Sequence, residues 1–207
     1  MGHYSNLGNQ PTIRKIQEAN KAVKKLKENS SNIRIAFPGL GAPSKIELVC
    51  FSDASHANLP GNASQGAYIV FIKGSGKIAP LIWQSRKLKR VTKSPLASET
   101  LALGEAADAA KLMVAQLVEI HQLSSLEEAP TIHCFTDSKS LYDATTTTNT
   151  VEDKSLRVEI ARIREMVELK EIFVHWVSNE FMLADVMTKK GASSEILLNA
   201  LATSKLC

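Results

Sequence analysis

The chain has few of the features that mark secreted, membrane-bound or zinc-binding proteins. It contains no run of about 18 uncharged apolar residues, the length that a membrane-spanning helix requires. Its first ten residues lack the basic start and the apolar stretch of a signal peptide. The three cysteines are odd in number and show no CxxC spacing, so neither a disulfide framework nor a zinc site is expected. We therefore expect an intracellular protein that makes no membrane contact.

Hydrophobic residues form 44% of the 207-residue sequence, which is enough to give one domain of about 150 residues a core. Apolar residues at spacings of three and four predict an amphipathic helix between Ile13 and Leu26. The segment FPGLGAPSK, which begins at Phe37, is rich in proline and glycine and predicts a boundary. Residues 1–45 are thus expected to form a basic helix and linker, and residues 46–207 the main domain.

The pattern after residue 46 predicts strands first and then helices alternating with strands. Three short apolar runs, IELVCFSDAS, GAYIVFIK and KIAPLIWQS, predict an antiparallel meander. A long helix follows from Ser94 to His121, with Pro95 in its first turn. TIHCFTDSKS and EIFVHWVSN predict two more strands separated by two helices, and a helix interrupted by Gly191 closes the chain. The expected fold class is α/β, a mixed five-stranded sheet flanked by helices with an N-terminal helical extension.

Four carboxylates lie close to the predicted ends of strands or helices. They are Asp53, Glu99, Asp137 and Asp185, in the contexts CFSDAS, ASET, CFTDSK and LADVMTK. Asp53 and Asp137 each follow an apolar run, and the carboxyl ends of parallel strands meet at one edge of a sheet. Clustered carboxylates repel one another unless cations lie between them, and Mg²⁺ prefers carboxylate and water oxygens. The pattern predicts a magnesium site, although each aspartate alone could cap a turn or helix, and Glu99 could complement its helix dipole.

Positive charge is concentrated in two parts of the sequence. The net charge is only +4, but residues 1–35 contain seven basic and two acidic side chains. A second cluster, called the basic cluster below, contains no acidic residue and consists of Arg86, Lys87, Lys89, Arg90 and Lys93. Two such patches could face a polyanion such as nucleic acid, or could be ordinary solvated surface.

The motifs around the four acids resemble the ribonuclease H domain of retroelement polyproteins, most closely that of copia-type retrotransposons. That family has, in order, an SDAD-like motif, W.S.K followed by SSxE, a TDSKS-like strand end and a closing LADxxTK. The matches here are FSDAS at 51–55, Trp83, Ser85 and Lys87 followed by ASET at 97–100, FTDSKS at 135–140 and LADVMTKK at 183–190. One such motif is weak, whereas four in order are specific. The helix at 13–30 is similar to the segment that joins polymerase to ribonuclease H in these polyproteins.

The resemblance implies an endonuclease that cleaves the RNA strand of RNA·DNA hybrids by two-metal hydrolysis, with Mg²⁺ as the metal and Mn²⁺ able to substitute. Asp53 would bridge both ions, Asp185 would help hold the ion that activates water, and Glu99 with Asp137 would hold the ion nearer the leaving oxygen. The basic cluster would contact the phosphates of the hybrid, with little sequence reading. The resemblance also implies the reverse transcriptase part of the same polyprotein as a partner, in a cytoplasmic particle or the nucleus.

One departure from the wider family and two alternative functions remain open. Many cellular and retroviral ribonucleases H have a histidine loop before the final aspartate, and the corresponding stretch here is only VSNEFML. His175 lies in the apolar run FVHWV, where we expect a packed side chain rather than a proton shuttle, and His56 is expected in a loop. The alternatives are a DNA-acting integrase or resolvase of the same superfamily, and a non-catalytic domain that binds nucleic acid or connects to a polymerase.

Overall fold

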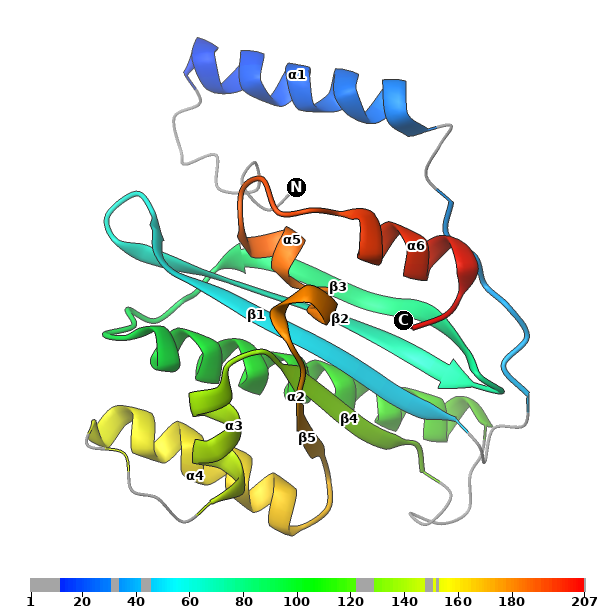
Figure 1. Ribbon diagram of the computed structural model, residues 1–207, viewed down its shortest axis with the longest axis vertical. Coiled ribbons are helices and arrows are strands. Elements are labelled where there is room, and N and C mark those ends of the chain that lie inside the picture. The colour runs from blue at the N-terminus through cyan, green and yellow to red at the C-terminus, as the bar shows by residue number, and fades with distance from the viewer. Residues whose placement is uncertain are drawn as a thin grey trace.

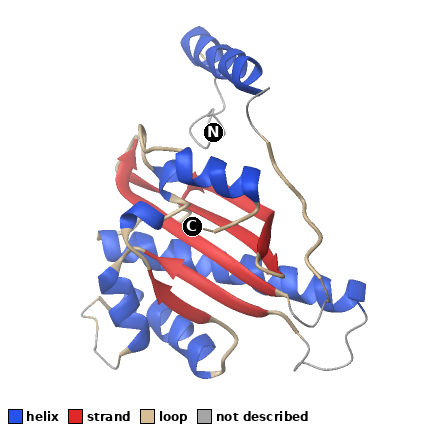
Figure 2. Ribbon diagram, turned by 45° about the vertical axis from the view of Figure 1, so that its right-hand side comes forward, coloured by secondary structure: helices blue, strands red, loops and turns tan. Residues whose placement is uncertain are grey.

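The computed structural model describes residues 12–30, 34–41, 46–121, 129–147, 151 and 153–206. In this part of the chain five strands form one sheet in the order β3-β2-β1-β4-β5, and helices cover both of its faces (Figures 1 and 2). In chain order the elements are α1 (Ile13–Asn29), β1 (Glu47–Leu59), β2 (Ala63–Gly74), β3 (Lys77–Lys87), α2 (Pro95–His121), β4 (Thr131–Thr136), α3 (Lys139–Thr146), α4 (Lys154–Glu168), β5 (Phe173–Trp176), the short 3₁₀ helix η4 (Asn179–Phe181), α5 (Asp185–Thr188) and α6 (Glu195–Thr203).

The sheet is mixed, and β1 is its central strand. β1 pairs antiparallel with β2, and β2 pairs antiparallel with β3, so the first three strands form the predicted meander. β4 pairs parallel with β1 on the other side, and β5 pairs parallel with β4. Helices join the parallel strands, as a crossover connection requires. These features confirm the predicted fold class, a mixed five-stranded sheet flanked by helices.

The prediction that Asp53 ends its strand is wrong, because β1 continues to Leu59. The parallel pairing of β1 with β4 stops at Phe51, whereas the pairing with β2 runs through Asp53, which lies opposite Ala67. Asp53 therefore lies in a part of β1 that is paired on one side only. His56, predicted in a loop, also belongs to β1. The apolar run ends earlier than the strand because the hydrogen bonds to β2 do not depend on apolar side chains.

Two hydrophobic cores lie on opposite faces of the sheet. Leu48 and Cys50 of β1 point into the core under α2, while Val49 and Phe51 point into the core under α5 and α6, as the alternation of a strand requires. The face of α2 that packs on the sheet is made of small residues with one leucine: Ala102, Leu103, Ala106, Ala107 and Ala110. Small side chains let α2 lie close to β1 and β2, which brings the first turns of this helix to the centre of the sheet.

The two ends of the chain differ in how far they agree with the predictions. The predicted N-terminal helix is confirmed as α1, none of whose described residues is buried. Residues 42–45, where the predicted linker ends, lie outside the described part, so the division into 1–45 and 46–207 stays a prediction. The predicted closing helix is divided into η4, α5 and α6.

None of the helices in the described ranges has the length and apolar character needed to cross a membrane.

Truncating the core face of α2 should destabilise the protein far more than truncating its outer face. Leu103 is 0% exposed and Leu112 is 56% exposed on the same helix. Leu103→Ala should lower the free energy of unfolding by about 2 to 5 kcal/mol, because it removes buried methyl groups and leaves a cavity. Leu112→Ala should change it by no more than about 0.5 kcal/mol. Urea unfolding followed by circular dichroism measures both, and equal losses would contradict this packing.

Candidate active site

Three of the four predicted carboxylates come together at the point where β1 extends past the end of β4. Asp53, Asp137 and Asp185 each place one carboxylate oxygen within 4.8 Å of the others, and we call these residues the aspartate triad. Asp53 lies in β1, Asp137 directly follows β4, and Asp185 is the first residue of α5. The convergence follows from topology, because β1 and β4 are parallel neighbours and α5 packs against β1 and β2.

Asp185 reaches the triad because the residues before it are anchored in the core under α5. Met182, Leu183 and Ala184 are all buried there. On the other side of Asp185, the backbone carbonyl of Met187 accepts hydrogen bonds from the side chains of Gln65 and Ser85, at 2.9 and 2.6 Å. The apolar surroundings of Asp185 in the sequence thus fix the short helix against the sheet and aim its first residue at β1.

Glu99 lies beside the triad without belonging to it. Its Oε1 accepts a hydrogen bond of 3.2 Å from the backbone N–H of Ala54, the residue after Asp53. Glu99 is only 9% exposed, and its Oε2 has no hydrogen-bond partner among the described residues. Burial raises the pKa of Glu99 from 4.5 to about 9, and the nearby charges of Asp53 and Asp137 add to this shift. With this pKa the carboxyl group of Glu99 is protonated at neutral pH in the metal-free protein, although the charge of Lys189 opposes the shift.

Asp53 is the most enclosed member of the triad, with 1% of its surface exposed. Burial raises its pKa, a hydrogen bond from the Thr188 hydroxyl to Oδ2 and the charge of Lys189 oppose that shift, and the charges of Asp137 and Asp185 reinforce it. Oδ1 of Asp53 is buried and accepts no hydrogen bond from any described residue. The pKa of Asp137 is also raised, mainly by burial. These raised pKa values mean that burial and mutual repulsion disfavour the charged carboxylates when no counterion is present.

Three residues at this site were not identified from the sequence. Thr188 bonds Asp53, and Lys189 pairs through its Nζ with Asp185 and lies 3.6 Å from Oδ1 of Asp53. Trp176 donates its indole N–H to the backbone carbonyl of Asp137 at 2.9 Å. Thr188 and Lys189 stand in the LADVMTKK motif, so the motif carried a signal for both. Nothing in the local sequence of Trp176 pointed to Asp137, because that contact depends on the pairing of β4 with β5.

The residues present fit a hard divalent cation. Every potential ligand is a carboxylate oxygen, which is the donor type that Mg²⁺ and Mn²⁺ take in proteins. Two buried oxygens, Oδ1 of Asp53 and Oε2 of Glu99, have no hydrogen-bond donor among the described residues, so each retains lone pairs for a ligand. A divalent ion would also offset the repulsion that adds to the rise in pKa caused by burial. The triad could therefore hold such an ion, with Glu99 next to it.

His175 and His56 have packing partners outside the triad. His175 lies with its Nε2 2.9 Å from Nδ1 of His133 and stacks on the ring of Phe135, and burial lowers its pKa. This agrees with the expectation of a packed side chain. His56 contributes to a group of hydroxyl hydrogen bonds, with Nδ1 3.1 Å from Oγ of Ser98. Ser98 precedes Glu99 in α2, so His56 helps to fix the start of that helix.

Three of the five residues of the basic cluster form ion pairs with acidic side chains that are distant in the sequence. Arg86 pairs with Glu105 at 3.2 Å, Arg90 with Glu159, and Lys93 with Asp153 at 3.8 Å. Lys87 and Lys89 form no ion pair with a described residue. The acids come from α2, from α4 and from the residue that caps α4. Two arginines and one lysine of the five predicted phosphate contacts are thus partly neutralised within the protein.

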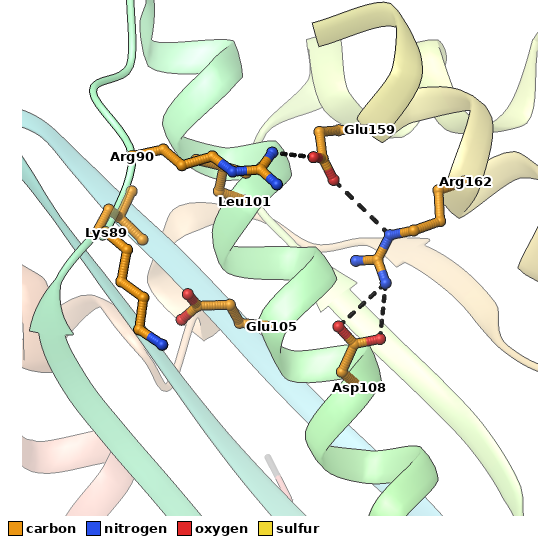
Figure 3. Close-up of a pocket in the computed structure, with 8 residues that line it drawn as sticks. Lys89, Arg90, Leu101, Glu105, Asp108, Glu159 and Arg162 are labelled. Carbon is orange, nitrogen blue, oxygen red and sulfur yellow. Dashed lines mark hydrogen bonds and ion pairs between the residues drawn. The ribbon is translucent and has the colours of Figure 1, made fainter. Parts of the chain in front are cut away.

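A pocket of about 390 Å³ lies beside the basic cluster, between the end of β3, α2 and α4. Figure 3 shows Arg90 extended toward Glu159, and Arg162 held by Asp108 on the opposite wall. Gly104 leaves room for Arg162, since a Cβ there would lie 2.6 Å from its Nη2. Because acidic and basic side chains alternate around this pocket, it has no strong charge of one sign.

Comparisons with known proteins give likeness to solved structures alone. The chain matches no protein-family model and no curated protein. A ribonuclease H1 isolated from compost by a metagenomic approach is 16% identical, with 65% of this chain and 86% of that one covered and a TM-score of 0.46. Ribonuclease H1 of the archaeon Halobacterium salinarum is 17% identical, with 65% and 87% covered and a TM-score of 0.42. The ribonuclease H domain of prototype foamy virus is 16% identical, with 79% and 93% covered and a TM-score of 0.42. Because the identities are 16 or 17% and the TM-scores are 0.42 to 0.46, these likenesses carry no argument about activity. Any statement about activity rests on the residues of the site.

In metal-free solution the protein should lose stability as the pH rises. The folded pKa of Glu99 is about 9 against an ordinary 4.5, so between these values the folded state binds more protons than the unfolded state. The contribution of Glu99 to the free energy of unfolding is then greatest below pH 4.5 and falls as the pH approaches 9, by up to about 1.4 kcal/mol per pH unit.

Urea unfolding in EDTA at several pH values between about 5 and 9 measures this dependence. Glu99→Gln should flatten it, because an amide does not ionise, and the difference between the two proteins isolates Glu99 from other titrating groups. Parallel curves for the wild type and the variant would contradict the burial of an ionisable group at this position.

Proposed function

We propose that this chain is a nuclease of the ribonuclease H type, which uses divalent metal ions to cleave the RNA strand of RNA·DNA hybrids. The observation that carries the proposal is the aspartate triad, whose carboxylate oxygens lie within 4.8 Å of one another. Its members come from three of the four motifs that resemble retroelement ribonucleases H, and the fourth motif supplies Glu99, whose carboxylate bonds the residue next to Asp53. These acids are tolerable together only when a cation lies among them. Such a cation site supports the proposal that the chain hydrolyses a phosphodiester.

In this proposal Asp53, Asp137, Asp185 and Glu99 hold two Mg²⁺ ions. When bound, two such ions supply an activated water molecule and stabilise the charge on the leaving oxygen. Neighbouring side chains and one backbone amide position these ligands. Thr188 fixes Asp53 through Oδ2, the amide of Ala54 fixes Glu99, and the indole of Trp176 holds the backbone of Asp137. Such support reduces the rearrangement needed when metal and substrate bind.

The proposed substrate is a hybrid duplex held mainly through its phosphates. Lys87 and Lys89 are the members of the basic cluster best suited to this contact, since neither forms an ion pair with a described residue. Arg86, Arg90 and Lys93 would have to exchange an intramolecular acid for a phosphate. Contacts of this kind give affinity with little dependence on base sequence. Glu99 could in addition contact a ribose 2′-hydroxyl, the group that distinguishes RNA from DNA.

The retroelement setting is also part of the proposal. It rests on the copia-like order of the four motifs and on α1, which stands where such polyproteins join polymerase to ribonuclease H. The apolar residues of α1 are exposed and its other side is basic, so it is suited to contact another part of a larger protein. A reverse transcriptase segment is the proposed partner, in a cytoplasmic particle or the nucleus.

Cleavage of a matched RNA·DNA hybrid with Mg²⁺ tests the activity directly. Asp53→Asn should lower the cleavage rate by at least about two orders of magnitude, because the central ligand loses its charge. Asp143→Asn is the control, since Asp143 lies on the surface of α3 and pairs only with Lys139 among the described residues. Equal rates for the wild type and Asp53→Asn would remove Asp53 from the mechanism, and cleavage of duplex DNA instead of the hybrid would favour a DNA-acting nuclease.

Hybrid binding should depend on Lys87 and Lys89 in the manner of side chains that neutralise phosphates. In an Asp53→Asn background, replacing both lysines by glutamine should weaken binding of all sequences alike. The slope of log affinity against log salt should become shallower by about one unit for each phosphate that is no longer neutralised. The matched control replaces Lys77 and Lys205 by glutamine. Lys77 starts β3 at the end opposite Lys87. Lys205 lies at that same end, because the backbone N–H of Ile78 bonds the carbonyl of Ser204. An unchanged slope in the first variant would exclude a phosphate-binding role for these two lysines.

A further inference from the structure

A lysine ammonium already lies where the proposed site calls for a cation. Nζ of Lys189 makes a hydrogen-bonded ion pair with Oδ1 of Asp185 and lies 3.6 Å from Oδ1 of Asp53. The latter oxygen is the buried one that accepts no hydrogen bond from any described residue. Lys189 is therefore the one cationic side chain, among the described residues, that pairs with two members of the triad.

The position of Lys189 is built into the fold. It follows α5 directly, four residues after Asp185, and this spacing places both side chains on the same face of a helical turn. Its backbone N–H bonds the carbonyl of Asp185 at 2.9 Å, and the neighbouring Thr188 bonds Asp53. The side chain is 42% exposed, so its tip can also leave toward solvent without unpacking the core.

The charge of Lys189 is stabilised by the same carboxylates. Burial alone would lower its pKa, but the hydrogen bond to Asp185 and the charges of Asp53, Asp185 and Asp137 raise it above the ordinary value. With its Nζ paired to Asp185 and 3.6 Å from Oδ1 of Asp53, Lys189 supplies part of the neutralisation that a divalent ion would supply in full.

We propose that Lys189 is a built-in competitor of the divalent ion: its ammonium holds Asp53 and Asp185 together without metal and is displaced when an ion binds to them. The inference deepens the proposed function and rests on it only in taking the aspartate triad as the metal site. A divalent ion on these carboxylates would repel the ammonium across a few ångströms and would compete with it for the same negative charge. Lys189 would then set the metal concentration at which the site fills.

If Lys189 competes with the ion, its removal should raise the affinity for metal and lower the stability of the metal-free protein. Without the ammonium, the triad is free to bind an ion more tightly. Without metal, the same removal leaves the carboxylates unneutralised and the fold less stable. A lysine that bound substrate and did not contact the triad would change neither property, and a lysine that helped to hold the metal-bound water would, when removed, weaken metal binding. The combination of tighter metal binding and a less stable metal-free protein is therefore specific to a competitor.

The experiment compares Lys189→Met with Lys190→Met in the full chain. Lys190 is the next residue, is exposed and forms no ion pair with a described residue, so its replacement makes the same change in net charge. Binding of Mn²⁺ is measured by calorimetry without nucleic acid. The dissociation constant should fall by about three- to fivefold in Lys189→Met, as expected for the removal of a partly exposed ion pair, and stay within about 1.5-fold in Lys190→Met.

Thermal unfolding provides the second measurement. In EDTA, Lys189→Met should melt at a lower temperature than Lys190→Met, and added Mn²⁺ should raise its melting temperature by more. Lys189→Arg keeps the charge and should restore the wild-type behaviour in both measurements. Unchanged or weaker Mn²⁺ binding by Lys189→Met overturns the proposal, and so does equal Mn²⁺ binding by the wild type and Asp53→Asn. Tighter binding by Lys189→Met without cleavage of a hybrid by the wild type supports competition and overturns the proposed function instead.

Discussion

The repulsion between buried carboxylates is the constraint on which the rest of this structure depends. Asp53, Asp137 and Asp185 share a small space with Glu99 beside them, and burial raises the pKa of Asp53, Glu99 and Asp137. Such a cluster persists only where other interactions hold it. The donors are the Thr188 hydroxyl, the Ala54 amide and the Lys189 ammonium, and each comes from an element that the cores fix in place.

The sheet and its two cores give each acid a rigid support. β1 has a parallel neighbour as far as Phe51 and only an antiparallel one at Asp53, so the strand carries this side chain beyond the end of β4. The alanine-rich face of α2 lets that helix lie against the sheet with Glu99 at its start. Met182 to Ala184 anchor α5 on the opposite side. The acids therefore meet at the boundary between two independently packed layers, where backbone positions are well determined.

The charges outside the site are arranged differently. Arg86 pairs with Glu105 of α2 and Arg90 with Glu159 of α4, so the basic cluster, which contains no acidic residue along the sequence, is partly neutral in space. Arg162 of α4 pairs with Asp108 of α2 in the same way. Ion pairs at such exposed positions are weak and exchange easily with other anions. The pair of Arg162 and Asp108 links α4 to α2, and in the proposed function Arg86 and Arg90 would exchange their acids for a phosphate. The carboxylates of the triad have no comparable freedom, because they are largely removed from solvent.

The sequence by itself determined the elements and the acids. Apolar periodicity and turn residues act over a few positions, so they predicted the meander, the long helix between Ser94 and His121 and the strands before Asp137 and after α4. The four motifs identified Asp53, Glu99, Asp137 and Asp185 as candidates. Only the tertiary structure decided that Asp53 lies within β1, that Arg90 meets Glu159, and that Lys189 lies against Asp53. These outcomes depend on burial and on distances between atoms whose residues are far apart along the chain, and no local pattern encodes such distances.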